Sequence, residues 1–226
     1  MGVELDKPLL NEKSKEENYT NEGGYAGTIR YLKNIMGLWI TQECKRHWEK
    51  QGETVTFGGL TDEAAQAAPF ACIIDVDDQR FFEPYNMPKK IQEYCQETGQ
   101  YVPQTKGEII RCVNESLALK YRQAIEGLEE IVGYTIPALH VVGGGCQHKL
   151  LNQFTANAIN RPVYAGPVEA TAIGNIATQL ISLGAVKSLA EAREVVRNSF
   201  DIDEYLPKDG EAWEAAYAKL LKLQGK

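Results

Sequence analysis

Three consecutive glycines, Gly143 to Gly145, form the stretch of this sequence whose residue types best suit ligand chemistry. The β-prone run from Leu139 to Val142 predicts a short strand before them, and apolar residues at helical spacing from Leu150 to Ala158 predict a helix after them. Residues without a Cβ let a ligand contact backbone N–H groups, and the start of a helix carries a partial positive charge. Phosphate is the ligand that such a loop favours.

The spacing of these glycines matches neither of the two common phosphate-binding motifs. Cys146 and Gln147 follow Gly145, so the run is neither G-x-G-x-x-G nor G-x-x-x-x-G-K-[ST], and Lys149 is not at the P-loop lysine position. The pattern alone therefore leaves two interpretations open. One is a phosphate-binding loop, and the other is a tight structural turn that lets a helix pack closely on a strand.

The elements around the glycines predict a βαβ unit within a helix-rich chain. A second strand at Pro162 to Ala165 would pair in parallel with the first through a right-handed crossover, so the loop lies at the carboxyl end of a strand. Val3 to Leu5 predicts a strand that needs a partner from elsewhere, and Phe70 to Ile74 is β-prone. Apolar periodicity predicts helices over Thr28–Lys50, from a cap at Thr61, from Pro88, over Thr105–Ile131 with a stop at Gly133, and over Ala170–Leu183, Leu189–Phe200 and Glu211–Leu221.

Two polar residues interrupt the apolar pattern of the predicted helix Thr28–Lys50. Asn34 and Gln42 either face solvent or reach a ligand from the wall of a site, and their position alone favours solvent. No other constellation resembles a catalytic centre, because there is no G-x-S-x-G elbow. Cys146 at a helix start has no orienting acid, and His148 is expected to be a surface residue.

Composition indicates a globular chain without a nucleic-acid or membrane partner. The 226 residues are 43% hydrophobic and 24% charged, as in an ordinary globular protein. The net charge is −7, and no segment combines a basic cluster with interleaved aromatic residues. No apolar run approaches the roughly 20 residues that span a bilayer. An odd number of cysteines and the lack of a secretory leader indicate the cytoplasm.

The five cysteines and three histidines show no ligand spacing of the zinc type. Neither C-x-x-C nor H-x-x-x-H occurs, so a thiolate metal site is not expected. Cys95 and Cys112 could pair if the helices that carry them were neighbours, but two reduced, half-buried thiols are the expected state.

Four segments resemble one known family. They are Asn18–Gly24, Leu32–Trp39, Leu139–Gln147 and Ala165–Thr171. Together they resemble the C-terminal half of rhamnulokinases, a branch of the FGGY family of carbohydrate kinases, over nearly the whole chain. The resemblance implies an α/β fold, a ribonuclease H-like lobe of the actin/hexokinase superfamily, helix-rich with a central mixed sheet. Residues 1–226 would form one nucleotide-binding domain.

The resemblance also implies roles for particular residues. Gly143, Gly144 and Gly145 match the glycine loop that contacts ATP, Gln42 matches a nucleotide-contacting position, and Asn34 matches a polar residue that faces the cleft. The implied reaction transfers the γ-phosphoryl group of ATP to L-rhamnulose with Mg²⁺. Kinases of xylulose or fuculose are the alternative within the family.

The family's catalytic motifs do not occur in this sequence. They are a His-Asp-Thr segment that carries the catalytic aspartate and a Gly-Thr-Trp-Ser phosphate turn, both in the first lobe, which also binds the sugar. The resemblance thus implies that Met1 is an internal residue of a longer parent protein. It also implies that this chain binds ADP or ATP but does not catalyse phosphoryl transfer on its own. Apolar surface left exposed would allow the chain to self-associate. Two other classes are a non-catalytic actin-like assembly module and a Rossmann-type dinucleotide domain, which the glycine spacing disfavours.

Overall fold

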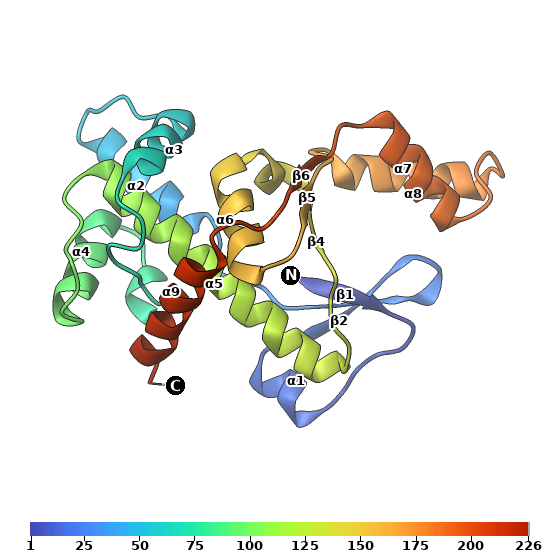
Figure 1. Ribbon diagram of the computed structural model, residues 1–226. Coiled ribbons are helices and arrows are strands. Elements are labelled where there is room, and N and C mark those ends of the chain that lie inside the picture. The colour runs from blue at the N-terminus through green and yellow to red at the C-terminus, as the bar shows by residue number, and fades with distance from the viewer. Residues whose placement is uncertain (226) are drawn as a thin grey trace. The chain divides into compact units, whose positions relative to one another are not determined.

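The computed structural model describes residues 1–225 and divides the chain into two compact units (Figure 1). The first unit comprises Met1–Ile136 and the segment that starts at Ala215, and the second comprises Pro137–Glu214. Each unit has its own three-stranded sheet. The expectation of one nucleotide-binding domain over residues 1–226 stays a prediction.

The first unit contains an antiparallel sheet that the sequence pattern did not predict. Its strands are β1 (Gly2–Leu5), β2 (Thr20–Gly23) and β3 (Ile29–Leu32), in the order β1-β3-β2. The predicted strand at Val3 to Leu5 is present as β1, and its partner is β3, where Tyr31 lies opposite Val3. The predicted helix from Thr28 was wrong over nearly its first half, since Ile29 and Leu32 fit helical spacing but belong to the central strand of this sheet, and the helix begins only at Trp39.

Two stacked tyrosines join this sheet to the longest helix of the described chain, α5 (Lys106–Val132). The ring of Tyr31 is fully buried and stacks on Tyr19 with a centroid separation of 4.8 Å. The Tyr31 hydroxyl donates to Ser14 Oγ at 2.6 Å, and the Tyr19 hydroxyl donates to the Ala124 carbonyl at 3.1 Å. Both phenol groups are therefore satisfied inside an otherwise apolar cluster that includes Leu128.

Helices and the loops between them make up the rest of the first unit. Their bounds are α1 (Glu12–Glu16), α2 (Trp39–Lys50), α3 (Phe57–Gln66), α4 (Met87–Glu97), α5, and α9 (Gly210–Leu223), which begins in the second unit. The predicted helix from Thr105 with a stop at Gly133 is confirmed: Thr105 and Glu108 form a capping box, and Gly133 adopts φ 79°. The cap of α3 is Thr56, which accepts from Gly59 N, so the prediction of Thr61 was wrong.

The β-prone segment Phe70 to Ile74 forms no strand. Its backbone N–H groups donate to side chains, with Phe70 bonded to Glu115 and Ile74 bonded to Ser116, both on α5. Side chains on a neighbouring helix thus replace the ladder that a strand would supply.

The second unit contains the predicted βαβ arrangement. Its elements are β4 (Leu139–Val141), a 3-10 helix η3 (Gly143–Gln147), α6 (Lys149–Ile159), β5 (Val163–Ala165), α7 (Ala170–Ser182), α8 (Leu189–Ser199) and β6 (Asp203–Tyr205). Strands β4 and β5 are parallel, and β6 adds to β5 in the antiparallel sense. This confirms the mixed sheet, although β6 was not predicted. In the part of the chain that is described, no helix combines the length and hydropathy of a membrane span.

The close approach of α5 to α3 yields a testable consequence at Gly107. A Cβ on Gly107 would lie 2.6 Å from the Glu63 carbonyl oxygen, whereas a Cβ on Gly127 of the same helix would meet no atom within 4 Å. We expect Gly107→Ala to lower the free energy of unfolding by about 1–3 kcal/mol through overpacking. Gly127→Ala should raise it by about 0.5–1 kcal/mol, because alanine favours the helix. Urea unfolding measures both, and a stabilised Gly107→Ala variant would contradict the close contact.

Candidate functional site

The glycine loop begins where strand β4 ends, at the carboxyl edge of a parallel strand pair. Val142 is still extended, with φ −125°, and Gly143 then turns the chain with φ +75°, which favours glycine. The Gly143 N–H donates to the Pro167 carbonyl at 3.1 Å. At this first position, therefore, the fold itself explains the glycine.

The second glycine of the loop has no such structural reason. Gly144 is exposed and has no left-handed φ, and a Cβ built on it would meet no atom within 4 Å. A Cβ on Gly145 would lie 3.6 Å from Val141 Cγ1, an ordinary contact. The structural turn thus accounts for Gly143, whereas no contact within the described residues requires a glycine at position 144.

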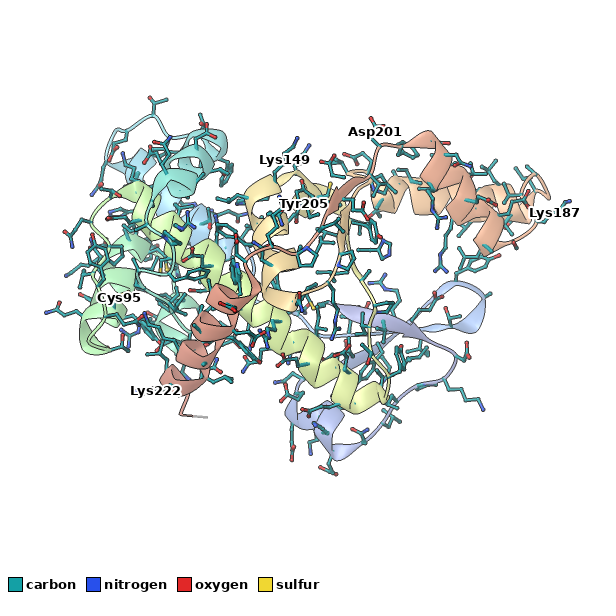
Figure 2. All side chains as sticks on the ribbon, viewed as in Figure 1. Cys95, Lys149, Lys187, Asp201, Tyr205 and Lys222 are labelled. Carbon is teal, nitrogen blue, oxygen red and sulfur yellow. The ribbon has the colours of Figure 1, made fainter. Side chains whose placement is uncertain are left out.

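The loop is fixed to the start of α6, whose first residue, Lys149, is labelled in Figure 2. Cys146 is 6% exposed, and its carbonyl accepts a bond of 2.9 Å from the Asn152 side chain. His148 caps α6, with Nδ1 accepting from Leu151 N at 3.3 Å, so the expectation of a surface residue was wrong. Burial lowers the pKa of His148 and favours the neutral ring that this cap requires.

A second loop, which follows β5, lies against the glycine loop. The Gly166 N–H donates to the Val141 carbonyl at 2.8 Å, next to the bond between Gly143 and Pro167. Gly166 has φ +133°, and a Cβ there would lie 2.9 Å from the Asp201 carbonyl oxygen. The loops at the carboxyl ends of two neighbouring parallel strands are thus joined by main-chain bonds, at the edge where α/β proteins commonly bind ligands.

The two predicted amide residues lie in the first unit. Gln42 is exposed on α2, whose buried residues include Ile40 and Cys44. Asn34 is exposed in the loop between β3 and α2, so its predicted place on a helix was wrong. The three glycines lie in the second unit. The side chains of Asn34 and Gln42 are exposed at the surface of the first unit.

One group of chemically active residues was missed. Cys72, Cys95 and Cys112 bring their Sγ atoms within 4.8 Å of one another in the first unit, where Cys95 is labelled in Figure 2. All five cysteines are free and buried, and the reduced state of Cys95 and Cys112 stays a prediction. The sequence held no signal for this cluster, because its members come from a loop and two helices with no short repeat.

Sequence comparison identifies similar proteins. Residues 1–183 match the model of the FGGY family of carbohydrate kinases, C-terminal domain. The chain is 47% identical over 217 residues to a rhamnulokinase of Bacteroides thetaiotaomicron, covering 96% of this chain and 44% of that protein. It is 45% identical over 209 residues to a rhamnulokinase of Bacillus subtilis, covering 92% and 42%. The chain therefore spans less than half the length of these curated relatives.

Solved structures share the fold at lower sequence identity. A xylulose kinase from Rhodospirillum rubrum matches with a TM-score of 0.66 and 17% identity, over 99% of this chain and 44% of that one. A Plasmodium falciparum glycerol kinase, solved with ADP, matches with a TM-score of 0.57 and 16% identity, over 85% and 37%. At this identity the likeness concerns the fold.

The cap on α6 predicts a pH-dependent stability. The folded state lowers the pKa of His148 below its usual value near 6.5, so the contribution of the cap is complete above about pH 6.5 and is lost as pH falls through the folded pKa. We expect a loss of about 1 kcal/mol, the usual value of an N-cap bond. Urea unfolding at several pH values measures it.

The matched variant is His148→Asn, whose side-chain oxygen caps a helix without titrating in this range. Its stability should lack the part of the pH dependence that His148 contributes, while His47 and His140 are unchanged. An identical pH profile in the two proteins would contradict the role of His148.

Proposed function

Because the chain belongs to the FGGY family of carbohydrate kinases, matching its C-terminal domain over residues 1–183, we propose that it is the nucleotide-holding half of a rhamnulokinase. The proposed parent enzyme transfers the γ-phosphoryl group of ATP to the 1-hydroxyl of L-rhamnulose. Identities of 45–47% to rhamnulokinases over most of this chain support this sugar over xylulose or fuculose.

The open backbone at Gly144 is the observation that carries the proposal. Its N–H and that of Gly145 lie in the first turn of η3, where a helix has no internal partner for its N–H groups. Nucleotide phosphates would accept from these groups, and Gly144 would let them come close. The net charge of −7 makes such local donors necessary, because the chain as a whole repels anions.

Magnesium would arrive with the nucleotide. Mg²⁺ at phosphoryl-transfer sites is bound through one or two carboxylates, substrate phosphates and water, so it needs no protein cage. This agrees with the described residues, among which the cysteine cluster is the one group of three or more ligand residues placed to hold an ion. ATP supplies the phosphoryl group, and Mg²⁺ neutralises the negative charge of the phosphates. The chain's own residues would bind and orient the nucleotide.

Gln42 and Asn34, both in the first unit, have separate roles in the proposed function. Both amides are exposed and carry donors and an acceptor suited to a base, a ribose or a phosphate. We assign Gln42 to the nucleotide and Asn34 to the cleft that faces the sugar. These roles come from the resemblance of their sequence segments to the family.

Catalysis would depend on the other lobe of the parent enzyme. Phosphoryl transfer requires a base that orients the attacking hydroxyl and a closed cleft that excludes water. The resemblance assigns the base, the sugar site and a second phosphate turn to that lobe.

Five free cysteines support a reducing compartment, so we propose the cytoplasm as the place of the reaction. The exposed apolar residues Ile176, Leu183 and Phe200 support self-association of the chain.

Calorimetric titration with MgADP tests the nucleotide site. We expect saturable one-site binding by the chain and a loss of at least about tenfold in affinity, or about 1.4 kcal/mol, in Gly144→Val. The valine side chain would occupy the space that the phosphates need. A matched control is Gly58→Val, an exposed helical glycine of the first unit that also has no atom within 4 Å. Equal binding by Gly144→Val and Gly58→Val would exclude the glycine loop, and no binding by the folded chain would favour an assembly module.

A second prediction concerns turnover. The 226-residue chain should release no detectable ADP from ATP and L-rhamnulose in a coupled assay, because the proposed base lies in the other lobe. Sugar-dependent ADP release by the purified chain would show that its own residues complete the reaction. That result would be compatible with nucleotide binding at the glycine loop. It would disprove the proposal that catalysis requires residues of the other lobe.

A further inference from the structure

Three buried thiols converge in the core of the first unit, apart from the glycine loop. Cys72 belongs to the loop between α3 and α4, Cys95 to α4, and Cys112 to α5. Their side chains are 2%, 0% and 2% exposed, and their Sγ atoms all lie within 4.8 Å of one another. All three are free thiols.

The backbone around these thiols is fixed by hydrogen bonds. The side-chain amide of Gln100, just after α4, accepts from Ile73 N at 3.0 Å and donates to Ile73 O at 2.8 Å. On the other side, Ser116 Oγ accepts from Ile74 N at 2.9 Å and donates to the Cys112 carbonyl at 2.6 Å. The loop that carries Cys72 is therefore bonded both to the end of α4 and to α5, and the three sulfurs are held in place before any ligand binds.

We propose that Cys72, Cys95 and Cys112 form a binding site for one thiophilic metal ion, held by three sulfur atoms. Metal–sulfur bonds of about 2.3 Å, as zinc makes, would set three sulfurs around a planar ion about 4 Å apart. The observed sulfur separations all lie within 4.8 Å, so none of them has to shorten by more than about 1 Å to reach this geometry. Each thiol that binds as a thiolate releases its proton to solvent.

Two ions share this chemistry, and they differ in charge and coordination. Cu⁺ is a soft ion that thiolates select, whereas Zn²⁺ usually takes a fourth ligand. Three thiolates leave a net charge of −1 with Zn²⁺ and −2 with Cu⁺. Lys219 of α9 acts on Cys72 and Cys95 through the Coulomb interaction, so a cation is available to offset one of these charges. Any negative charge of the buried cluster that is left without a partner would lower the stability of the metal complex.

Metal retention after refolding tests the site, because a buried site is loaded as the chain folds. The full chain is refolded with a thiol-free reductant, under anaerobic conditions, with one equivalent of Zn²⁺ or Cu⁺, and is then washed with excess glutathione. We expect one ion per chain by elemental mass spectrometry, and retention of one ion rather than the other identifies the natural ligand. Loss of both ions to glutathione would overturn the proposal and leave the thiols as small apolar core residues.

Matched variants separate the cluster from other buried thiols. Cys72→Ala, Cys95→Ala and Cys112→Ala should each lose the ion, whereas Cys44→Ala and Cys146→Ala, also buried and free, should keep it. Retention by all five variants would overturn the assignment. X-ray absorption on the metal-loaded wild type gives an independent measurement if a variant misfolds: three sulfur neighbours support the site, and a shell dominated by nitrogen or oxygen disproves it.

Discussion

The first unit depends on hydrogen bonds that side chains of α5 make to the backbone of the segment from Phe70 to Ile74. That segment is half-buried at Phe70 and buried from Cys72 to Ile74 without a strand partner, and an unpaired buried N–H costs as much as a lost hydrogen bond. Glu115, 1% exposed, accepts from Phe70 N at 2.9 Å, while Arg111 holds the same carboxylate at 2.7 Å. Burial raises the pKa of Glu115 and Arg111 opposes that effect. The loop's path, and with it the position of Cys72, follows from these bonds.

Local signals in the sequence predicted the elements whose stability is local. The helix from Thr105 could be predicted because its capping box and its terminal glycine lie within the element itself. The βαβ unit could be predicted because its strands and helix follow one another in the chain. The sheet of β1, β3 and β2 could not, because Val3 and Tyr31 pair across a long separation and the apolar spacing of Ile29 and Leu32 suits a helix equally well.

The candidate site also combines features that the sequence predicts with features that appear only in the folded structure. The three glycines look equivalent in sequence, yet Gly143 is explained by its positive φ and Gly144 is not. That difference requires the backbone conformation, which composition does not encode. The cysteine cluster requires still more, because its three members meet only when a loop, α4 and α5 have packed. Spacing rules describe metal sites built from short repeats and fail for ligands brought together by tertiary structure.

Two main-chain hydrogen bonds link the glycine loop to the loop after β5: Gly143 N to Pro167 O, and Gly166 N to Val141 O. Because the bonded atoms belong to the main chain, these two bonds survive replacement of a neighbouring side chain that leaves the backbone conformation intact. A displacement of the glycine loop that keeps these bonds would also displace the segment that leads into α7.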